Sequence, residues 1–152
     1  MLEVEILGVH DGQSHPVVLL RHEDRVLPIV VGLPEAQAIQ VGLLEEKLGR
    51  PMTHDLVCNI LAGLRAQMES VTIYKLENDT FYAHLNLSQK NAAGEIEQLV
   101  RVDSRPSDGI AIAVRTRCPI YVAEEVMDTA GQEVNPSESE ESEPEEDDES
   151  SD

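Results

Sequence analysis

The chain is poor in aromatic residues, with a single Phe, three Tyr and no Trp among its 152 residues. A folded core must therefore be built from Val, Ile, Leu and Ala. No apolar run approaches the ~20 residues that a helix needs to cross a bilayer. The N-terminal segment also lacks the basic stretch followed by a long apolar stretch that is typical of a signal peptide. We therefore expect a cytoplasmic protein with no membrane span.

Cysteine is also scarce, and its two occurrences do not form a motif. Cys58 and Cys118 lie far apart in apolar runs, and the chain has no CxxC pair. No spacing resembles a zinc motif, a phosphate-binding Walker loop or the GxSxG turn of a serine hydrolase. We expect both thiols to be reduced and buried.

Basic residues are also scarce in this chain. The formal net charge is -19, and residues 133–152 contribute eleven acidic side chains and no Lys or Arg. The rest of the chain has nineteen acidic and eleven basic residues, so it is acidic as well. This composition argues against a broad basic face for nucleic-acid phosphates, although a small local basic site is still compatible with it.

The composition divides the chain into two parts. Residues 1–131 read as one domain, because their length and apolar content suffice for a core. Residues 132–152 form an acidic tail, and from Pro136 onward it has no large apolar residue. Such a segment cannot offset its chain entropy by burial, so we expect it to be disordered. It can serve as a solubilising tail, or its acid-flanked serines can serve an acid-directed kinase.

Periodicity predicts the elements of the domain. Alternation of apolar and acidic residues over Leu2–Ile6 is typical of a half-buried strand. The same reasoning predicts further strands at 17–21, 26–31, 70–76, 80–87, 96–102 and 120–123. It predicts helices at 34–47, 53–66, 106–115 and 124–129. The order βββ-α-α-βββ-α-β-α indicates an α+β fold with a mixed, largely antiparallel sheet and helices packed against it.

Arg105-Pro-Ser-Asp108 stands at the entrance of the third predicted helix. Pro106 suits the first helical position, so Ser107 and Asp108 fall in the first turn, where free backbone N–H groups gather. Such a place can hold a phosphate, with Arg105 as a forked donor. The alternative is an ordinary helix entrance at which Asp108 complements the helix dipole.

Other acidic and titratable residues also stand at predicted helix entrances. His54 and Asp55 follow Thr53, the expected N-cap of the second helix, and His54 is a candidate general base or metal ligand. Glu35 and Glu124 open two further helices. Clustered carboxylates can hold a divalent cation for phosphodiester hydrolysis, although acidic residues favour first turns in any case.

Four segments in order resemble the bifunctional nuclease domain family of bacteria and plants. They are LPIVVGLPEAQAI (27–39), RPMTHDL (50–56), TFYAHL (80–85) and VDSRPSDGIAIAVRTRCPIYVAEEV (102–126). The resemblance spans nearly all of residues 1–127. It implies a compact α+β fold, activity on both DNA and RNA, and self-association. The positions that match the family's motifs are Glu35, His54, Asp55, Arg105, Ser107, Asp108 and Glu124.

These observations lead to a specific hypothesis of a metal-assisted nuclease. The catalytic residues would be His54, Asp55, Arg105 and Asp108, and the phosphate would be bound by Arg105 and Ser107. The ligands of Mg²⁺ or Mn²⁺ would be Glu35, Asp55, Asp108 and Glu124. The hypothesis requires the helix entrances to converge in space.

Three other interpretations stay open. The acidic composition favours a non-catalytic module that binds a protein or a nucleic acid or regulates expression. The Arg105 region alone would fit a small anionic ligand. The motifs can also be architectural, with Asp108 paired to Arg105 or Arg115 to lock the last long helix to the sheet. For any of them we expect a homodimer or higher homo-oligomer, because sheets with exposed apolar faces commonly pair across a two-fold axis.

Overall fold

The computed structural model describes residues 1–134. The strands are β1 (Leu2–Asp11), β2 (Pro16–His22), β3 (Arg25–Val30), β4 (Ala66–Glu77), β5 (Thr80–Lys90), β6 (Ile96–Ser104), β7 (Ile120–Val122) and β8 (Gln132–Glu133). The helices are α1 (Leu33–Leu43), α2 (Thr53–Gly63), α3 (Pro106–Thr116) and α4 (Glu124–Ala130). Apart from its first three residues, the expected acidic tail lies outside the described residues.

The eight strands form one mixed sheet in the order β6-β5-β4-β7-β1-β2-β3-β8. Among the described strands, β4 and β7 pair in parallel and every other neighbouring pair is antiparallel. The predicted α+β class and the element order are confirmed. The short β8 is an addition, since it pairs with Arg25 and Val26 of β3. Pro28 of β3 lies outside the short segment that pairs with β8. Its missing N–H therefore costs no hydrogen bond between these two strands.

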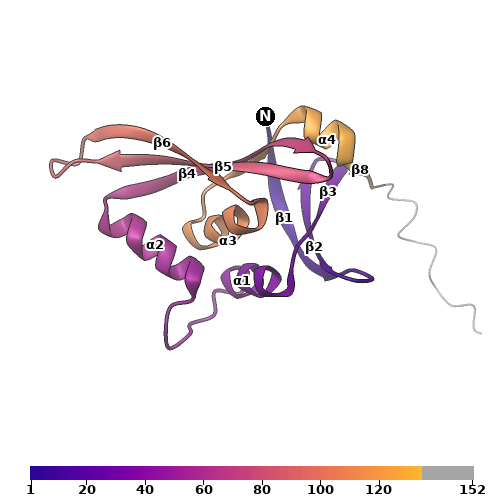
Figure 1. Cartoon of the computed structure of the whole chain (residues 1–152), viewed down its shortest axis with the longest axis horizontal. Coiled ribbons are helices and arrows are strands. Elements are labelled where there is room, and N and C mark those ends of the chain that lie inside the picture. The colour runs from indigo at the N-terminus through magenta and orange to yellow at the C-terminus, as the bar shows by residue number, and fades with distance from the viewer. Residues whose placement is uncertain (135–152) are drawn as a thin grey trace, which may run out of the picture.

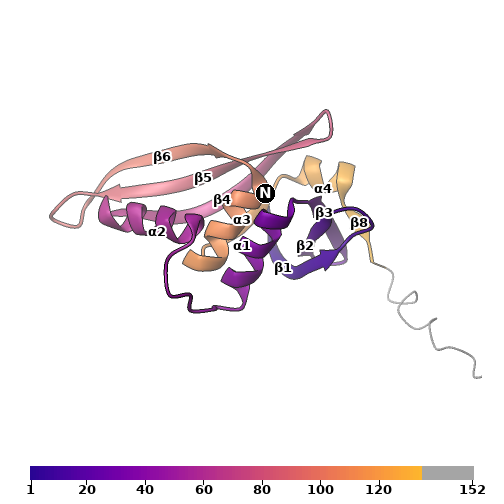
Figure 2. The same ribbon diagram turned by 60° about the horizontal axis from the view of Figure 1, so that its bottom comes forward.

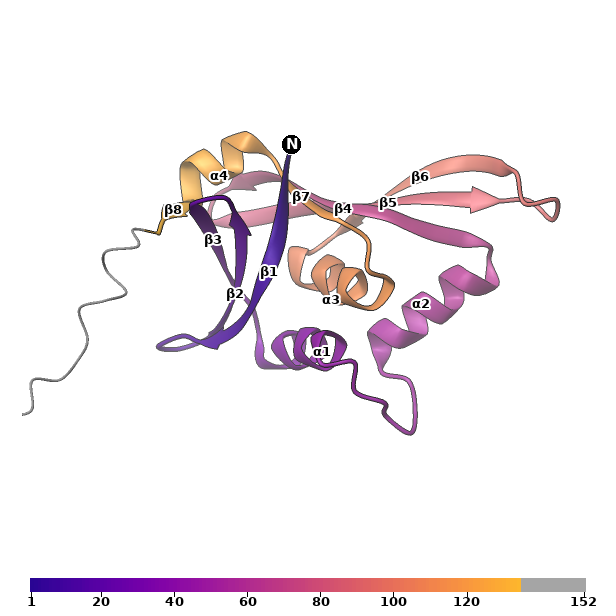
Figure 3. The ribbon, with the colours of Figure 1, turned by 180° about the vertical axis from the view of Figure 1, so that it is seen from behind.

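Strand β1 joins two differently oriented parts of the sheet. Its start pairs with β7 and its end with β2, and the register shifts between Ile6 and Gly8. Gly8 has a φ of 143°, which L side chains rarely adopt. Figures 1 and 3 show β1–β3 running steeply across the direction of β4–β6.

The helices occupy different sides of the long strands. Helices α1, α2 and α3 lie on one side of β4–β6, and α4 lies on the other, beside β3 (Figures 1 and 3). Helix α3 packs on α1 and on the sheet (Figure 2). Its Gly109 allows this close approach, because a Cβ there would come within 2.8 Å of Val71 Cγ1. The core includes Ile110, Ala111 and Ile112 of α3.

Several predicted boundaries differ from the structure, among them the end of β1, which extends to Asp11 rather than residue 6. Four of the differences, at α1, α2 and the start of β4, have a clear local reason. Helix α1 ends at Leu43 rather than residue 47, because Glu45 adopts a left-handed conformation with φ 51°. Helix α2 has its N-cap at Met52, whose N–H donates to Asp55 Oδ2 at 2.8 Å, so Thr53 is the first helical residue. It ends at Gly63, and the left-handed Arg65 directs the chain into β4 four residues earlier than predicted.

Within residues 1–134, no helix is both long and apolar enough to cross a membrane.

Candidate active site

Three helix entrances meet at one cleft of about 780 Å³. Its polar lining includes Glu35 from the first turn of α1, His54 from the first turn of α2, and Arg105 and Asp108 at the start of α3. Its apolar lining is Pro34, Ala38, Met52, Val57, Leu85 and Ile112. The convergence that the nuclease hypothesis requires is therefore found for these three entrances.

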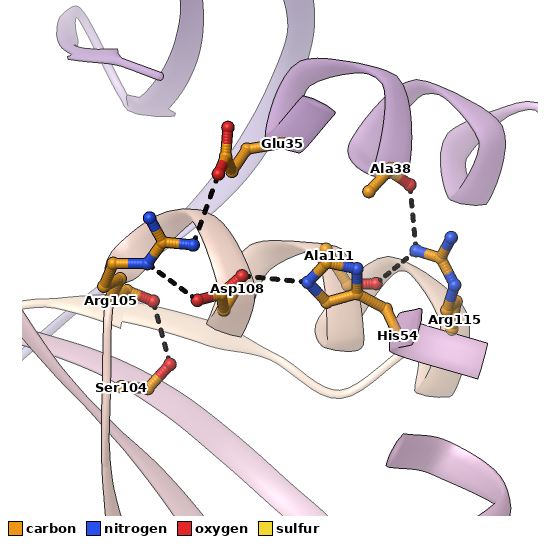
Figure 4. Close-up of polar contacts among 8 residues, drawn as sticks. All are labelled: Glu35, Ala38, His54, Ser104, Arg105, Asp108, Ala111 and Arg115. Atoms are coloured by element: carbon orange, nitrogen blue, oxygen red, sulfur yellow. Dashed lines mark hydrogen bonds and ion pairs between the residues drawn. The ribbon is translucent and has the colours of Figure 1, made fainter. Parts of the chain in front are cut away.

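Asp108 connects the polar side chains of the cleft. Its Oδ1 lies 2.9 Å from His54 Nε2, and its Oδ2 accepts from Arg105 Nε, also at 2.9 Å (Figure 4). Burial raises the pKa of this carboxyl, but the hydrogen bonds from Arg105 and His54 outweigh burial and hold the pKa below its usual value. An ionised carboxylate can only accept a hydrogen bond, so Nε2 of His54 is the protonated donor to Asp108.

His54 is held on the wall of the cleft. Its side chain is 13% exposed, and the contact with Asp108 fixes the direction of the ring. The other ring nitrogen, Nδ1, is buried and has no hydrogen-bond partner among residues 1–134. A buried polar atom without a partner is unusual in a folded protein. His54 therefore has one nitrogen bound to Asp108 and one that is buried without a partner among residues 1–134.

Arg105 is the exposed cation of the site. Its side chain is 66% exposed, and besides Asp108 it donates through Nη2 to Glu35 Oε1 at 3.3 Å. The guanidinium thus bridges carboxylates from two helices at the surface of the cleft (Figure 4). Such exposed ion pairs are weak, so an incoming anion can compete for Arg105.

Ser107 lies next to the cleft, on the buried side of the α3 entrance. It is 8% exposed and lines a neighbouring pocket of about 380 Å³, which Arg105 and Glu35 also line. Arg105 and Ser107, the predicted phosphate-binding residues, are therefore close together. Arg105 lines both the cleft and the smaller pocket, whereas Ser107 lines only the smaller pocket.

Asp55 points toward Arg115 rather than into the cleft. Its Oδ1 accepts from Arg115 Nε at 2.7 Å, and its Oδ2 caps α2 through the Met52 N–H. The hydrogen bond from Arg115, helped by that from Met52, lowers the pKa of Asp55. In this arrangement Asp55 stabilises the start of α2.

Arg115 lies next to the cleft but is not among the predicted site residues. It is only 8% exposed, and its Nη1 donates to the carbonyl oxygens of Ala38 at 2.9 Å and Ala111 at 2.7 Å. One guanidinium therefore ties α1, α2 and α3 together beside the cleft. The architectural interpretation paired Asp108 with Arg105 or Arg115. The first pairing is present, whereas Arg115 pairs with Asp55 instead.

Glu124 is not brought to the cleft. It opens α4, on the other side of the sheet, and its charge acts on Arg25, which is hydrogen-bonded to Asp128 (Figures 1 and 3). Since Asp55 also faces elsewhere, the four carboxylates expected to hold a metal are not assembled in one place. Glu35 and Asp108 are the two that share the cleft.

The family pattern described as the bifunctional nuclease domain matches residues 17–135, a range that contains all three entrances of the cleft. The chain belongs to this family.

Curated relatives of the bifunctional nuclease domain come from bacteria and plants. An uncharacterized protein of Mycobacterium tuberculosis is 40% identical over 145 residues, covering 93% of this chain and 82% of the relative. Bifunctional nuclease 1 of Arabidopsis thaliana is 30% identical over 115 residues, covering 74% of this chain and 34% of the relative. Bifunctional nuclease 1 of Oryza sativa subsp. indica is 28% identical over 140 residues, covering 88% and 41%. The chain thus spans only part of the plant proteins.

The cleft of this bifunctional nuclease domain has side chains of the type that bind a divalent cation, but they are not arranged as a metal site. Carboxylate oxygens such as those of Glu35 and Asp108 are ligands that Mg²⁺ and Mn²⁺ accept. However, Arg105 already bridges these two carboxylates. Within residues 1–134, no group of three or more His, Cys, Asp or Glu side chains is placed to hold a metal ion.

Proposed function

We propose that this bifunctional nuclease domain hydrolyses phosphodiester bonds of DNA and RNA in the cleft lined by Glu35, His54, Arg105 and Asp108. The observation that carries the proposal is the position of Asp108 between an imidazole and an exposed guanidinium, at 2.9 Å from each. A phosphate-binding cation and a proton-exchanging ring are thereby held next to each other. The family description and the names of the plant relatives, both of which say bifunctional nuclease, support nucleic acid as the substrate class.

The proposed roles follow from the chemistry of hydrolysis. A water oxygen bonds to phosphorus, and the bond from phosphorus to the leaving sugar oxygen breaks. The water loses one proton, and the leaving sugar oxygen gains one. Arg105 binds a non-bridging phosphate oxygen and stabilises the charge that grows there. The pair formed by His54 Nε2 and Asp108 exchanges a proton with the reactants, since Nδ1 is buried, and Asp108 holds the ring in the required direction and tautomer.

A divalent cation would be held in this proposal by Glu35 and Asp108, the two expected ligands that share the cleft. When Arg105 engages a phosphate, the carboxylates of Glu35 and Asp108 lose their shared partner and can act as oxygen ligands. Mg²⁺ or Mn²⁺ bound there would polarise the phosphoryl group. Asp55 and Glu124 have no part in this site, because Asp55 is paired with Arg115 and Glu124 opens α4 on the other side of the sheet.

The test is cleavage of single-stranded RNA and DNA with Mg²⁺, Mn²⁺ or EDTA, comparing the full chain with the variants Asp108→Asn and Glu124→Gln. All three proteins are purified identically, because a contaminating nuclease would act equally in each preparation. We expect metal-dependent cleavage that Asp108→Asn abolishes and Glu124→Gln retains. Equal cleavage by all three proteins would contradict the proposed site.

A second candidate is a non-catalytic nucleic-acid-binding or protein-binding module. The specific observation in its favour is that, among residues 1–134, Arg105 is the single Lys or Arg side chain lining the cleft, where it is offset by Glu35 and Asp108. An acidic chain repels nucleic acid at long range. Folded protein that binds but does not cleave, with either cation, would favour this candidate.

A further inference from the structure

The smaller pocket beside the cleft is formed by segments that lie far apart in the chain. They are the end of β3 with the residues that follow it, the turn between β4 and β5, and the start of α3. Its volume of about 380 Å³ falls within the range of about 300–1,000 Å³ that is typical of small-molecule sites. The roles proposed for the cleft leave this pocket without a ligand.

The ion pair of Arg105 with Glu35 lies where the smaller pocket and the cleft meet. Among residues 1–134, these two are the residues that line both spaces. Arg105 Nη2 donates to Glu35 Oε1 at 3.3 Å (Figure 4). A Cβ at Gly32 would overlap Glu35 Oε2, so the glycine leaves room for the carboxylate at this boundary. An anion that takes the place of Glu35 on Arg105 would therefore have one space beside it in the cleft and another in the smaller pocket.

The lining of the smaller pocket suits an uncharged group with apolar faces. Five of its side chains are apolar, namely Ile29, Val30, Val31, Phe81 and Pro106. Within the described part of the chain, Arg105 is its one basic side chain, whereas Asp79 and Glu35 are both acidic. These carboxylates would repel a second phosphate. The pocket therefore favours a neutral group over another anion.

Ser107 gives the smaller pocket a polar group without a partner. The residue is 8% exposed, and its hydroxyl makes no hydrogen bond to another group of residues 1–134. Polar groups this deeply buried are normally hydrogen-bonded. A serine hydroxyl can both donate and accept, so it can bind a sugar hydroxyl or the polar edge of a base. Since Ser107 lines the pocket, a ligand there can supply the missing partner.

We propose that the smaller pocket binds one of the two nucleosides that flank the phosphate held by Arg105. A phosphodiester carries a sugar on each side of its phosphorus, and Arg105 borders two spaces. A base in the smaller pocket packs against Phe81 and Pro106, and Ser107 hydrogen-bonds the nucleoside. The other nucleoside lies in the cleft. This inference rests on the proposed function, because it takes the position of the phosphate from it.

The test compares inorganic phosphate with adenosine 3′-monophosphate and adenosine 5′-monophosphate. Each is titrated into the full isotope-labelled chain, and the amide chemical shifts are followed by NMR. We expect all three ligands to shift the amide of Arg105. At least one nucleotide should also shift the amides of Thr80 and Phe81, which inorganic phosphate should leave unchanged. That nucleotide should bind at least tenfold more tightly than inorganic phosphate.

Two variants locate the nucleoside. Val30 is 63% exposed and lines the pocket, so Val30→Trp should fill the pocket and lower nucleotide affinity to that of inorganic phosphate. Ser107→Ala should weaken nucleotide binding about 2- to 10-fold, the effect of one neutral hydrogen bond. The matched control is Leu99→Trp, at a leucine of β6 that is 77% exposed and does not line this pocket, and it should keep full affinity. The dispersion of the amide shifts shows whether each variant is folded.

The possible failures separate this inference from the proposed function. Nucleotides that bind no more tightly than inorganic phosphate would overturn the smaller pocket as the nucleoside site, and so would full nucleotide affinity in Val30→Trp and Ser107→Ala. The proposed function would survive either result, because the Arg105 amide would still respond to phosphate. Ligands that leave this amide unchanged, and that bind Arg105→Ala equally well, would instead contradict phosphate binding at Arg105 and with it both proposals.

Discussion

His54 on α2 and Asp108 on α3 are joined by a 2.9 Å contact between Nε2 and Oδ1, although 54 residues separate them in the chain. The contact joins the motif of residues 50–56 at the start of α2 to the motif of residues 105–108 at the start of α3. It leaves the second nitrogen of His54 without a protein partner among residues 1–134. The geometry therefore makes Asp108 the residue on which the candidate site most depends.

Replacing Asp108 by Asn should lower the rate of nucleic-acid cleavage by about 10²- to 10⁴-fold, the usual contribution of a positioned acid–base group. The amide keeps the size of the side chain but loses its charge, so Arg105 and His54 are no longer held together. The measurement is the single-turnover cleavage rate of a labelled single-stranded RNA. A fall of less than threefold in a folded variant would contradict the role assigned to Asp108.

Arg105→Ala should weaken nucleic-acid binding and reduce its salt dependence. Loss of one phosphate contact to a single strand lowers the slope of log K against log salt by about 0.7. The measurement is the affinity for a phosphorothioate oligonucleotide, which resists cleavage, at several salt concentrations. Arg21→Ala is the control, since Arg21 is an exposed arginine that pairs with Glu5 on the sheet. Equal slopes for the two variants would refute the phosphate contact.

Asp55→Asn should destabilise the fold by about 2 kcal/mol at neutral pH, because it leaves the buried Arg115 guanidinium without its counter-charge. This is less than a fully buried pair contributes, since a third of the Asp55 side chain is exposed. The measurement is the free energy of unfolding in urea. Asp11→Asn, at an exposed residue with no ion pair among residues 1–134, should change it by less than about 0.5 kcal/mol.

The effect of Asp55→Asn should also depend on pH. Folding lowers the pKa of Asp55 below its ordinary value of 3.8, so the folded state favours the ionised form. Its contribution is fully present above that ordinary value and is lost as the pH falls through the lower, folded-state pKa. The stability difference between the two proteins should therefore be constant from pH 7 to about 5 and shrink below about pH 4. A difference that stays constant down to pH 3 would show that the charge of Asp55 is not responsible.

Gly42→Ala should destabilise the chain even though alanine favours helices. A Cβ at Gly42 would overlap Val114 Cγ2 and lie 2.9 Å from Arg115 Nη1, so α1 and α3 would have to separate. Overpacking of this kind costs about 1–3 kcal/mol, more than the ~1 kcal/mol that alanine adds to a helix. Urea unfolding measures the change. Adding Val114→Ala should recover part of it, and no recovery would place the clash elsewhere.

Local patterns predicted most elements and two of the site's motifs. Pro106 and Asp108 mark a helix entrance by chemistry that acts within one turn, and the structure has a helix there. The boundaries that shifted depend on single backbone conformations, such as the left-handed Glu45, which no periodicity reveals. Glu35 and Glu124 carry the same signal, an acid in a first turn, yet one lines the cleft and the other opens α4 on the other side of the sheet.

By itself, the sequence determined the fold class, the order of elements, the helix entrances and the family resemblance, because these depend on periodicity and on interactions between near neighbours. Only the tertiary structure decided which entrances meet. Arg105 reaches Glu35 across 70 residues and Arg115 reaches Asp55 across 60. Such pairs depend on how α1, α2 and α3 pack on the sheet, and that packing is set by the shapes of many side chains at once.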